Sequence, residues 1–144
     1  MTRKNMFKKI HIAIPALLMA LAIPAQADNR EAMGTDAQGN SVYLETDNMT
    51  RKGYVVYAWQ QINRVQKDDQ GALYVRAQLE FDCKYLKSRT MWMTLQTEHD
   101  GKGTTISSGA TSNPEWVPAE EGTLLGKMRE FSCLHVFRTK ATLM

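Results

Sequence analysis

The sequence predicts an α+β fold: a single antiparallel β-sheet of five to six strands, with one C-terminal helix packed on one face and stapled by a disulfide. Three observations support this prediction. Segments in which apolar residues alternate with polar ones recur along the middle of the chain. Polar segments that contain glycine separate them, and a single helical pattern lies near the C-terminus. Two cysteines, Cys83 and Cys133, are available to join sheet and helix.

Residues 1–27 have the pattern of a cleavable signal peptide. A basic start precedes an apolar run at residues 10–23, and residues 25–27 (Ala-Gln-Ala) form a small-x-small cleavage site before Asp28. The apolar run contains Pro15 and is too short for a membrane span of about 20 residues. We therefore expect a periplasmic or secreted protein, cleaved between Ala27 and Asp28, with no membrane span afterwards. No cysteine lies near the cleavage site, which predicts that no lipid anchor is attached.

The charge balance argues against nucleic acid as a partner. The whole chain has 18 Lys and Arg against 15 Asp and Glu, a net charge of +3. Four of the basic residues and none of the acidic ones lie in residues 1–27, so residues 28–144 carry 14 basic and 15 acidic residues. Nucleic-acid binding requires a concentrated basic face, and a net charge near −1 does not predict one.

The first part of the exported chain is expected to be irregular. Residues 28–41 are polar and lack a hydrophobic period, so we expect a flexible N-terminal segment there and place the folded domain at residues 42–134. A short strand is predicted at residues 42–44, followed by a polar turn at residues 47–53. Residues 54–65 are the strongest strand candidate, because aromatic and β-branched residues dominate them. Residues 67–71 have the composition of a hairpin connection.

The next segments continue an antiparallel sheet. Residues 73–83 place apolar side chains on one face, namely Leu73, Val75, Ala77, Leu79 and Phe81. This alternation predicts a half-buried antiparallel strand. In residues 89–98, Met91, Met93 and Leu95 alternate in the same way against Trp92, Thr94 and Gln96. A turn at residues 99–103 and a return strand at residues 104–108 follow. Two prolines in residues 113–118 exclude a central strand there and predict an extended connection.

One helix is predicted at residues 123–134. Leu124, Met128, Phe131 and Leu134 are spaced at steps of three and four, which is typical of a buried helix face. Two glutamates precede the helix, where negative charge is favourable. Residues 135–144 are then expected to form a C-terminal tail.

Export would place the two cysteines of the chain in an oxidising compartment. In an oxidising compartment two lone cysteines favour a disulfide between Cys83 and Cys133. Free buried thiols and an intermolecular bridge are the alternatives. The intramolecular bridge would tie the end of a central strand to the helix.

The sequence predicts no catalytic residue, no cofactor and no metal site. His99 and His135 lack a third ligand at zinc spacing, and Ser108 lacks the Gly-x-Ser-x-Gly context of a hydrolase nucleophile. Asp82, which precedes Lys84 and Arg89, is expected to form a salt bridge at the end of its strand rather than to act as a catalytic carboxylate.

The three tryptophans are the remaining candidates for a binding role, because aromatic residues often anchor interfaces. Trp59 and Trp116 are expected in the core. Trp92 lies on the strand face opposite Met93 and Leu95. A sheet with one helix leaves its second face open, so Trp92 is the candidate binding residue; a place in the core is the alternative.

Several of these segments together resemble the surface-adhesin protein E family of bacterial envelope proteins. The resemblance covers residues 42–133 and rests on Val-Tyr-Ala-Trp at 56–59, Leu-Glu-Phe-Asp-Cys at 79–83, Arg89, Asn-Pro-Glu-Trp-Val-Pro at 113–118, Gly122-Thr123 and Cys133. It implies one antiparallel sheet with a helix on one face, fastened by a cysteine bridge. Named members act as adhesins that bind host extracellular-matrix and serum proteins, and they can form dimers.

The resemblance implies an exported, non-enzymatic protein-binding domain whose partner is a host extracellular-matrix or serum protein, with a homodimer as a further expectation. The chain departs from the family pattern because it lacks a cysteine for lipid attachment, which leaves display on the cell surface open. The alternative is a soluble periplasmic protein with a housekeeping or stress role, which binds a small ligand or an envelope component.

Overall fold

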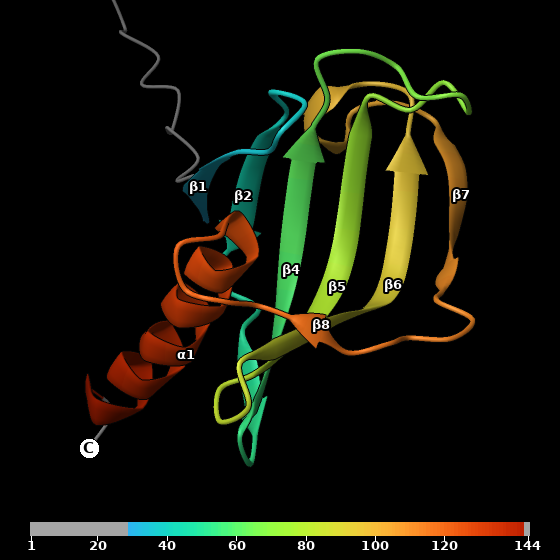
Figure 1. Cartoon of the computed structure of the whole chain (residues 1–144). Coiled ribbons are helices and arrows are strands. Elements are labelled where there is room, and N and C mark those ends of the chain that lie inside the picture. Colours follow the sequence, from blue (N-terminus) through green and yellow to red (C-terminus); the bar gives the residue numbers. More distant parts are fainter. Residues whose placement is uncertain (1–28, 143–144) are drawn as a thin grey trace, which may run out of the picture.

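The computed structural model describes residues 29–142, with side chains described through residue 139. The predicted signal peptide and its cleavage site therefore lie outside the described residues. The structure is a curled antiparallel sheet with one helix in front of it (Figure 1). The strands are β1 (Arg30–Thr35), β2 (Ser41–Glu45), β3 (Thr50–Lys52), β4 (Val55–Asn63), β5 (Tyr74–Asp82), β6 (Lys87–Gln96), β7 (Thr105–Ala110) and β8 (Val117–Pro118). A short 3₁₀ helix, η1 (His99–Gly101), follows β6, and α1 (Leu124–Thr142) ends the described chain.

The sheet has eight strands, so the predicted number of five to six is wrong. Its main path runs β1-β2-β4-β5-β6-β7, and every pairing is antiparallel. The short strand β3 pairs with the first half of β4, and β8 pairs with the start of β6. The strands that the sequence pattern missed are β1, β3 and β8. Two of these segments are very short and β1 is largely polar, so none of them shows hydrophobic alternation. They are strands because their backbones pair with neighbouring strands.

The predicted flexible segment at residues 28–41 is corrected by β1. This strand pairs with β2 along its length, with a bulge between Ala32 and Gly34. Met33 is 2% exposed and belongs to the main core, and its carbonyl oxygen accepts a hydrogen bond of 2.6 Å from Lys127 Nζ of α1. One buried side chain and one helix contact thus fix a strand that has no apolar period. The folded domain begins at β1 and not at residue 42.

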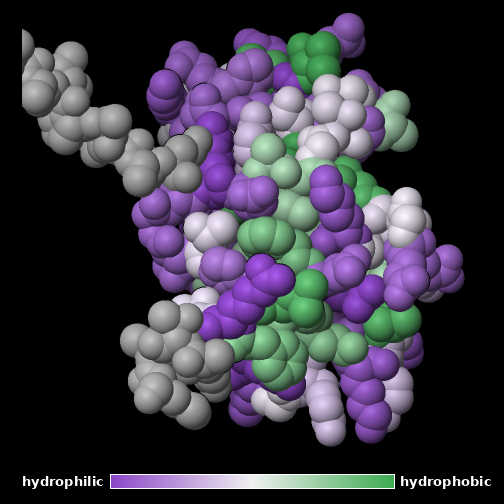
Figure 2. All heavy atoms as spheres, turned by 90° about the vertical axis from the view of Figure 1, so that its left-hand side faces the viewer, coloured by the Kyte–Doolittle hydropathy of each residue, from purple (hydrophilic) through white to green (hydrophobic). Residues whose placement is uncertain are grey.

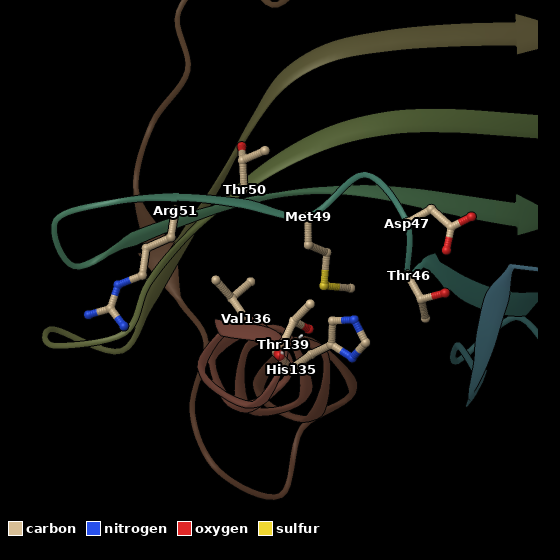
Figure 3. Close-up of a pocket in the computed structure, with 8 residues that line it drawn as sticks. All are labelled: Thr46, Asp47, Met49, Thr50, Arg51, His135, Val136 and Thr139. Carbon is tan, nitrogen blue, oxygen red and sulfur yellow. Dashed lines mark hydrogen bonds between the residues drawn. The ribbon is translucent and has the colours of Figure 1, made fainter. Parts of the chain in front are cut away.

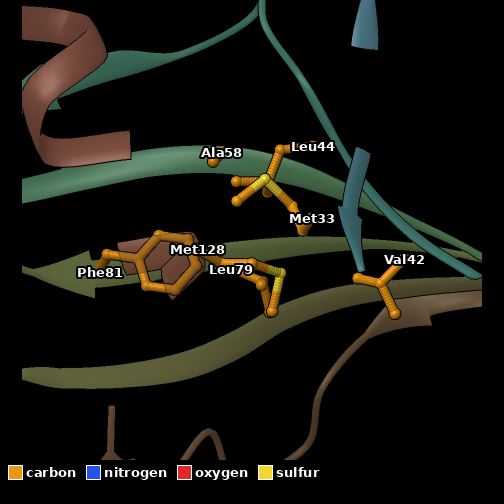
Figure 4. Packing of buried hydrophobic residues seen from close by; sticks show 7 residues of the cluster. All are labelled: Met33, Val42, Leu44, Ala58, Leu79, Phe81 and Met128. Atoms are coloured by element: carbon orange, nitrogen blue, oxygen red, sulfur yellow. The ribbon is translucent and has the colours of Figure 1, made fainter. Parts of the chain in front are cut away.

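The core lies between the sheet and α1. Figure 4 shows its main cluster, in which side chains from β1, β2, β4 and β5 meet Met128 of the helix. Its buried members are Met33, Val42, Leu44, Ala58, Leu79, Phe81 and Met128. We call the sheet face that carries these side chains the inner face, and the face opposite α1 the outer face. In Figure 1 the helix lies on the β1, β2 and β4 side of the sheet, and β7 lies at the far side from it.

The start of α1 is set by a threonine cap. Thr123 Oγ1 accepts a hydrogen bond of 3.0 Å from the Gly126 N–H, which satisfies one of the free amides of the first turn. The helix continues to Thr142, so the predicted tail at residues 135–144 is helical over most of its length. Val136 within this part is 7% exposed and packs against Val56.

One predicted helix contact is wrong. Leu134 is 49% exposed, whereas Leu124, Met128 and Phe131 pack into the core as expected. Leu134 follows Met128 by six residues, and at about 100° per residue this places the two side chains roughly 120° apart around the helix. The buried stripe passes instead through Ser132 and Val136.

The predicted disulfide is present. Cys83, just after β5, is bonded to Cys133 in α1, and their Cα atoms are 6.0 Å apart. Cys133 is 8% exposed and lies in a small cluster with Val56 and Val136. The bridge therefore attaches the middle of the helix to the end of a central strand.

Candidate binding surface

Trp92 lies on the outer face of the sheet. It pairs with Gln78 of β5 and with Ala110 of β7. Because Ala77 and Leu79 on either side of Gln78 belong to the buried inner face, alternation places Trp92 on the outer one. The residue is 39% exposed, and its indole Nε1 donates a hydrogen bond of 3.2 Å to Ser108 Oγ. The position agrees with the sequence prediction; the binding role of Trp92 stays a prediction.

Trp59 and Trp116 are not core residues, which corrects the prediction made for them. Trp59 lies on the outer face, opposite Gln78, and the Arg76 guanidinium stacks 3.8 Å above its ring. Trp116 is 36% exposed, and the Arg89 guanidinium lies 4.5 Å from its ring centre. Both indoles therefore use an arginine side chain as their packing partner, in the geometry of a cation–π contact.

The same arginines are fixed by buried glutamates. Arg76 Nε and Nη2 donate to the two carboxylate oxygens of Glu45, at 2.6 and 2.8 Å, which is a bidentate pair. Arg89 Nε donates to Glu80 Oε2 at 2.6 Å, and Glu80 is only 5% exposed. A third arginine, Arg30, stacks 4.2 Å above the Tyr43 ring. The outer face thus presents aromatic rings and guanidinium groups in fixed positions.

The Arg76–Glu45 pair keeps both of its charges near neutral pH. Burial by itself raises the pKa of Glu45, but hydrogen bonds from Arg76, Gln61 and Asn48 and the charge of Arg76 together outweigh it, so the pKa is lowered from 4.5. The hydrogen bond to Glu45 raises the pKa of Arg76. Burial and the neighbouring Glu45 raise the pKa of Tyr74 to about 12, so its phenol stays neutral. The surface therefore offers a set of opposite charges that cancel locally.

A second candidate surface is a groove between α1 and the chain that leads from β2 into β3 (Figure 3). Its volume is about 660 Å³, within the range of small-molecule sites. The lining residues are Thr46, Asp47, Met49, Thr50, Arg51, His135, Val136 and Thr139. Figure 3 shows the Met49 side chain pointing from the β2–β3 connection toward the helix, beside the His135 imidazole.

The groove continues onto an apolar part of the surface. Arg51 at its rim lies 4.0 Å above the ring of Phe137, which is 54% exposed. His135 stacks on Phe131 at 5.5 Å between ring centres. Figure 2, which faces this side of the molecule, shows apolar residues gathered between hydrophilic ones. An apolar ligand with an anionic group would match Arg51 and the apolar lining, and no pattern in the sequence pointed to this groove.

The structure assigns ordinary roles to the remaining polar candidates. Asp82 Oδ1 accepts hydrogen bonds of 2.9 Å from the backbone N–H groups of Lys84 and Tyr85, so it stabilises a turn and does not form the salt bridge predicted for it. Ser108 Oγ lies 2.7 Å from Thr94 Oγ1 on the outer face. His99 Nε2 lies 2.7 Å from the Arg64 carbonyl oxygen. Within residues 29–142, no cluster of three or more His, Cys, Asp or Glu side chains could hold a metal ion.

The structure has known relatives among solved folds. It is similar to the crystal structure of protein E from non-typeable Haemophilus influenzae, with a TM-score of 0.57 and 13% identity, over 79% of this chain and 82% of that chain. A second crystal form of Haemophilus influenzae protein E gives a TM-score of 0.55 at 13% identity, over 75% of this chain and 89% of that one. Identities this low establish a shared fold.

The sequence itself identifies the family. No curated protein matches the chain. The family described as Surface-adhesin protein E matches residues 31–134, which include β2 through β8 and the N-terminal half of α1. Because this match spans most of the chain, the protein belongs to the surface-adhesin protein E family.

Proposed function

We propose that this chain is an exported, non-enzymatic domain that binds a host extracellular-matrix or serum protein through the outer face of its sheet. The observation that carries the proposal is the position of Trp92, 39% exposed on the sheet face opposite α1. Membership of an adhesin family supports the choice of a protein partner. Among the described residues, no helix has the length and apolar character needed to cross a bilayer.

The outer face has the features of a rigid protein-binding surface. Tryptophan and arginine are the residue types most enriched at the energetic centres of interfaces. Here the arginines are held by Glu45 and Glu80 and stacked on aromatic rings, so little side-chain freedom is left to lose on binding. A rigid surface with locally cancelled charges favours a partner recognised by shape and aromatic contact.

Export is a further part of the proposal. Residues 1–27 have the signal-peptide pattern described above, and cleavage between Ala27 and Asp28 would release the domain. Mass spectrometry of the protein recovered from the periplasm and the culture medium tests this directly. An N-terminus other than Asp28, or a full-length chain, would contradict the proposed cleavage.

Biolayer interferometry against vitronectin and laminin tests the binding proposal. Trp92→Ala should weaken binding by about 30-fold, the effect of losing one strong interface anchor. Phe137→Ala is the matched control, because it removes another exposed aromatic residue from the α1 side. Thermal melts of both variants confirm that they fold. No binding of the unaltered protein at micromolar concentration would refute the adhesin role, and equal effects of the two variants would refute the outer-face site.

The groove beside α1 favours a second candidate function, a periplasmic protein that binds a small ligand or an envelope component. Its volume of about 660 Å³ and its mixture of Met49, Val136 and Arg51 suit a small molecule with an apolar body and an anionic group. Cell fractionation separates the two functions. Recovery from the periplasmic extract alone favours the small-ligand function, whereas recovery at the cell surface or in the medium favours adhesion.

A further inference from the structure

The two ends of the sheet are protected very differently. At one end, β1 carries Arg30 and Glu31, is interrupted by a bulge, and has its Met33 carbonyl capped by Lys127 of the helix. Charges, bulges and covering elements are the usual means of blocking a sheet edge. At the other end, β7 lies at the free side of the sheet, away from α1 (Figure 1).

Of these protections β7 has only a bulge near its start, where its register with β6 shifts between Leu95 and Gln96. No Lys, Arg, Asp or Glu occurs between Lys102 and Glu115, and the six residues of β7, Thr-Ile-Ser-Ser-Gly-Ala, include no proline. The other short edge strands differ from it: β3 contains Arg51 and Lys52, and β8 ends in Pro118. Within residues 29–142, β7 therefore has the longest edge that is neither charged nor covered by another element.

The direction of its free backbone groups follows from the ladder. The Thr111 N–H donates to the Met91 carbonyl at 2.9 Å. In an antiparallel ladder alternate residues bond to the same neighbour. The backbone N–H and C=O groups of Gly109 and Ser107 therefore also face β6. The N–H and C=O groups of Ser108 and Ala110 then point away from the sheet. They are positioned to bond to one additional strand.

Side chains beside this edge are also uncovered. Trp92 on the outer face pairs with Ala110, and Met93 on the inner face pairs with Gly109. Their neighbours in β7 are too small to cover them, so Trp92 is 39% exposed and Met93 is 42% exposed. Ile106 of β7 itself is 37% exposed. A strand added beyond β7 would lie about 10 Å from β6, within reach of long side chains that lean across the small residues.

We propose that the β7 edge binds an extended, uncharged segment of a partner protein, which adds to the sheet as a ninth strand and covers Trp92 and Met93 with large apolar side chains at neighbouring positions. This proposal rests on the proposed protein-binding function and names the part of the partner that is recognised. Strand addition supplies affinity through main-chain hydrogen bonds and specificity through side-chain contacts.

A second copy of the chain fits this edge less well. If β7 paired with its own equivalent, Ile106 would be the one large apolar side chain that the second copy adds, since the other residues of the strand are Thr, Ser, Gly and Ala. Such a pair would satisfy the backbone, but Ile106 lies on one face of its strand and could cover at most one of Trp92 and Met93, which lie on opposite faces. A segment with bulky apolar residues satisfies both requirements, and it is therefore the occupant that the structure favours.

The probe is a phage-displayed library of random 12-residue peptides, selected on the purified protein. We expect enriched peptides with adjacent large apolar residues and no charge or proline in their central part. Ala110→Pro removes one outward N–H while leaving the β6 ladder intact, because proline is tolerated at such edge positions. Binding of the enriched peptides should fall at least about tenfold. Ala110→Ser is the matched control, which keeps the N–H and a small side chain beside Trp92 and should bind as the unaltered protein does.

A second arm does not depend on any variant. The best peptide is synthesised again with N-methyl groups on alternate amides, in the two possible phases. One phase should abolish binding, and the other should preserve it, because only alternate amides of an added strand face β7. Equal effects of the two phases, equal peptide binding by the two Ala110 variants, or no enrichment at all would overturn the proposal.

Two outcomes separate this proposal from the proposed function. If Ala110→Pro leaves vitronectin and laminin binding unchanged and no peptide binds at the edge, the adhesin role stands and strand addition is refuted. If edge peptides bind while neither host protein does, strand addition stands and the adhesin role is refuted. Self-association that Ala110→Pro abolishes would show that a second copy occupies the edge, and it would overturn the assignment to a partner segment.

Discussion

Removal of the Cys83–Cys133 bridge should cost a large part of the stability of this domain. The two residues are separated by 50 positions in the sequence. For a closed loop of this length, the chain-entropy relation gives a stabilisation of about 4 kcal/mol, because the bridge limits the freedom of the unfolded chain. Domains of this size are stable by only about 5–15 kcal/mol. At roughly 4 °C per kcal/mol, the melting temperature should fall by roughly 15 °C.

The variant for this test is Cys83→Ala/Cys133→Ala, which leaves no free thiol behind. Urea denaturation followed by circular dichroism gives both the midpoint and the m-value. The entropic mechanism predicts a lower midpoint together with a higher m-value, since an unbridged unfolded chain exposes more surface. The unaltered protein measured with reductant is the control and should match the double variant. Equal midpoints with and without the bridge would refute the reasoning, and a lower midpoint at constant m-value would place the effect in the native state.

Two further predictions concern single positions. Gly126→Ala would normally stabilise a helix by about 1 kcal/mol, but here the new Cβ would lie in severe overlap with the Glu120 carbonyl oxygen. We expect a loss of about 2 kcal/mol or more in urea denaturation, with Gly109→Ala as the control, because its Cβ would meet no atom within 4 Å. Burial raises the pKa of Glu45, but the hydrogen bonds and the charge of its partners, Arg76 foremost, together lower it; this lowered pKa contributes stability that is present above about pH 4.5 and is lost as the pH falls through the folded-state pKa. Thermal melts should therefore show a gap between the unaltered protein and Glu45→Gln at neutral pH that narrows on acidification; a gap independent of pH would contradict the linkage.

The central part of the fold was predictable because its strands alternate. The pattern at residues 73–83 matches β5 closely, and Val75, Ala77, Leu79 and Phe81 are all buried on the inner face. Strand β1 could not be found in this way. It buries Met33 alone, and its place depends on pairing with β2 and on a contact from the helix, which are interactions distant in sequence.

The exposed position of Trp92 was also predictable, although by a partly incorrect route. The sequence pattern places Met91, Met93 and Leu95 on one face. The register between β5 and β6 shifts between Gln78 and Leu79, so Trp92 and Thr90 oppose consecutive residues of β5 and Met91 is the additional residue of a bulge. The alternation holds from Trp92 to Leu95 and is broken before it. A register shift depends on the partner strand, and no single-strand pattern reveals it.

The environments of Trp59 and Trp116 were not predictable from hydrophobicity. Each indole is covered by a guanidinium, and an arginine can cover apolar surface with its stem while its charge stays paired at the tip. The pairs bring together residues 17 and 27 positions apart in the sequence, across strands and a long connection. Hydrophobicity alone predicts that tryptophan is buried among apolar side chains. It does not predict an indole that packs against an arginine side chain at the surface.

The asymmetry of the sheet links its stability to its binding surfaces. The helix is anchored by the disulfide and by Lys127, and it closes the β1 side of the domain. The same helix leaves Met93 exposed on the inner face at the opposite side, and its β7 partner Gly109 has no side chain to cover it. An uncharged free edge beside exposed apolar residues is a liability, because it invites unspecific pairing with other chains. Binding of a partner segment would explain why the edge is kept. One added strand would bond to the free backbone groups of β7 and would also cover the exposed side chains of Trp92 and Met93.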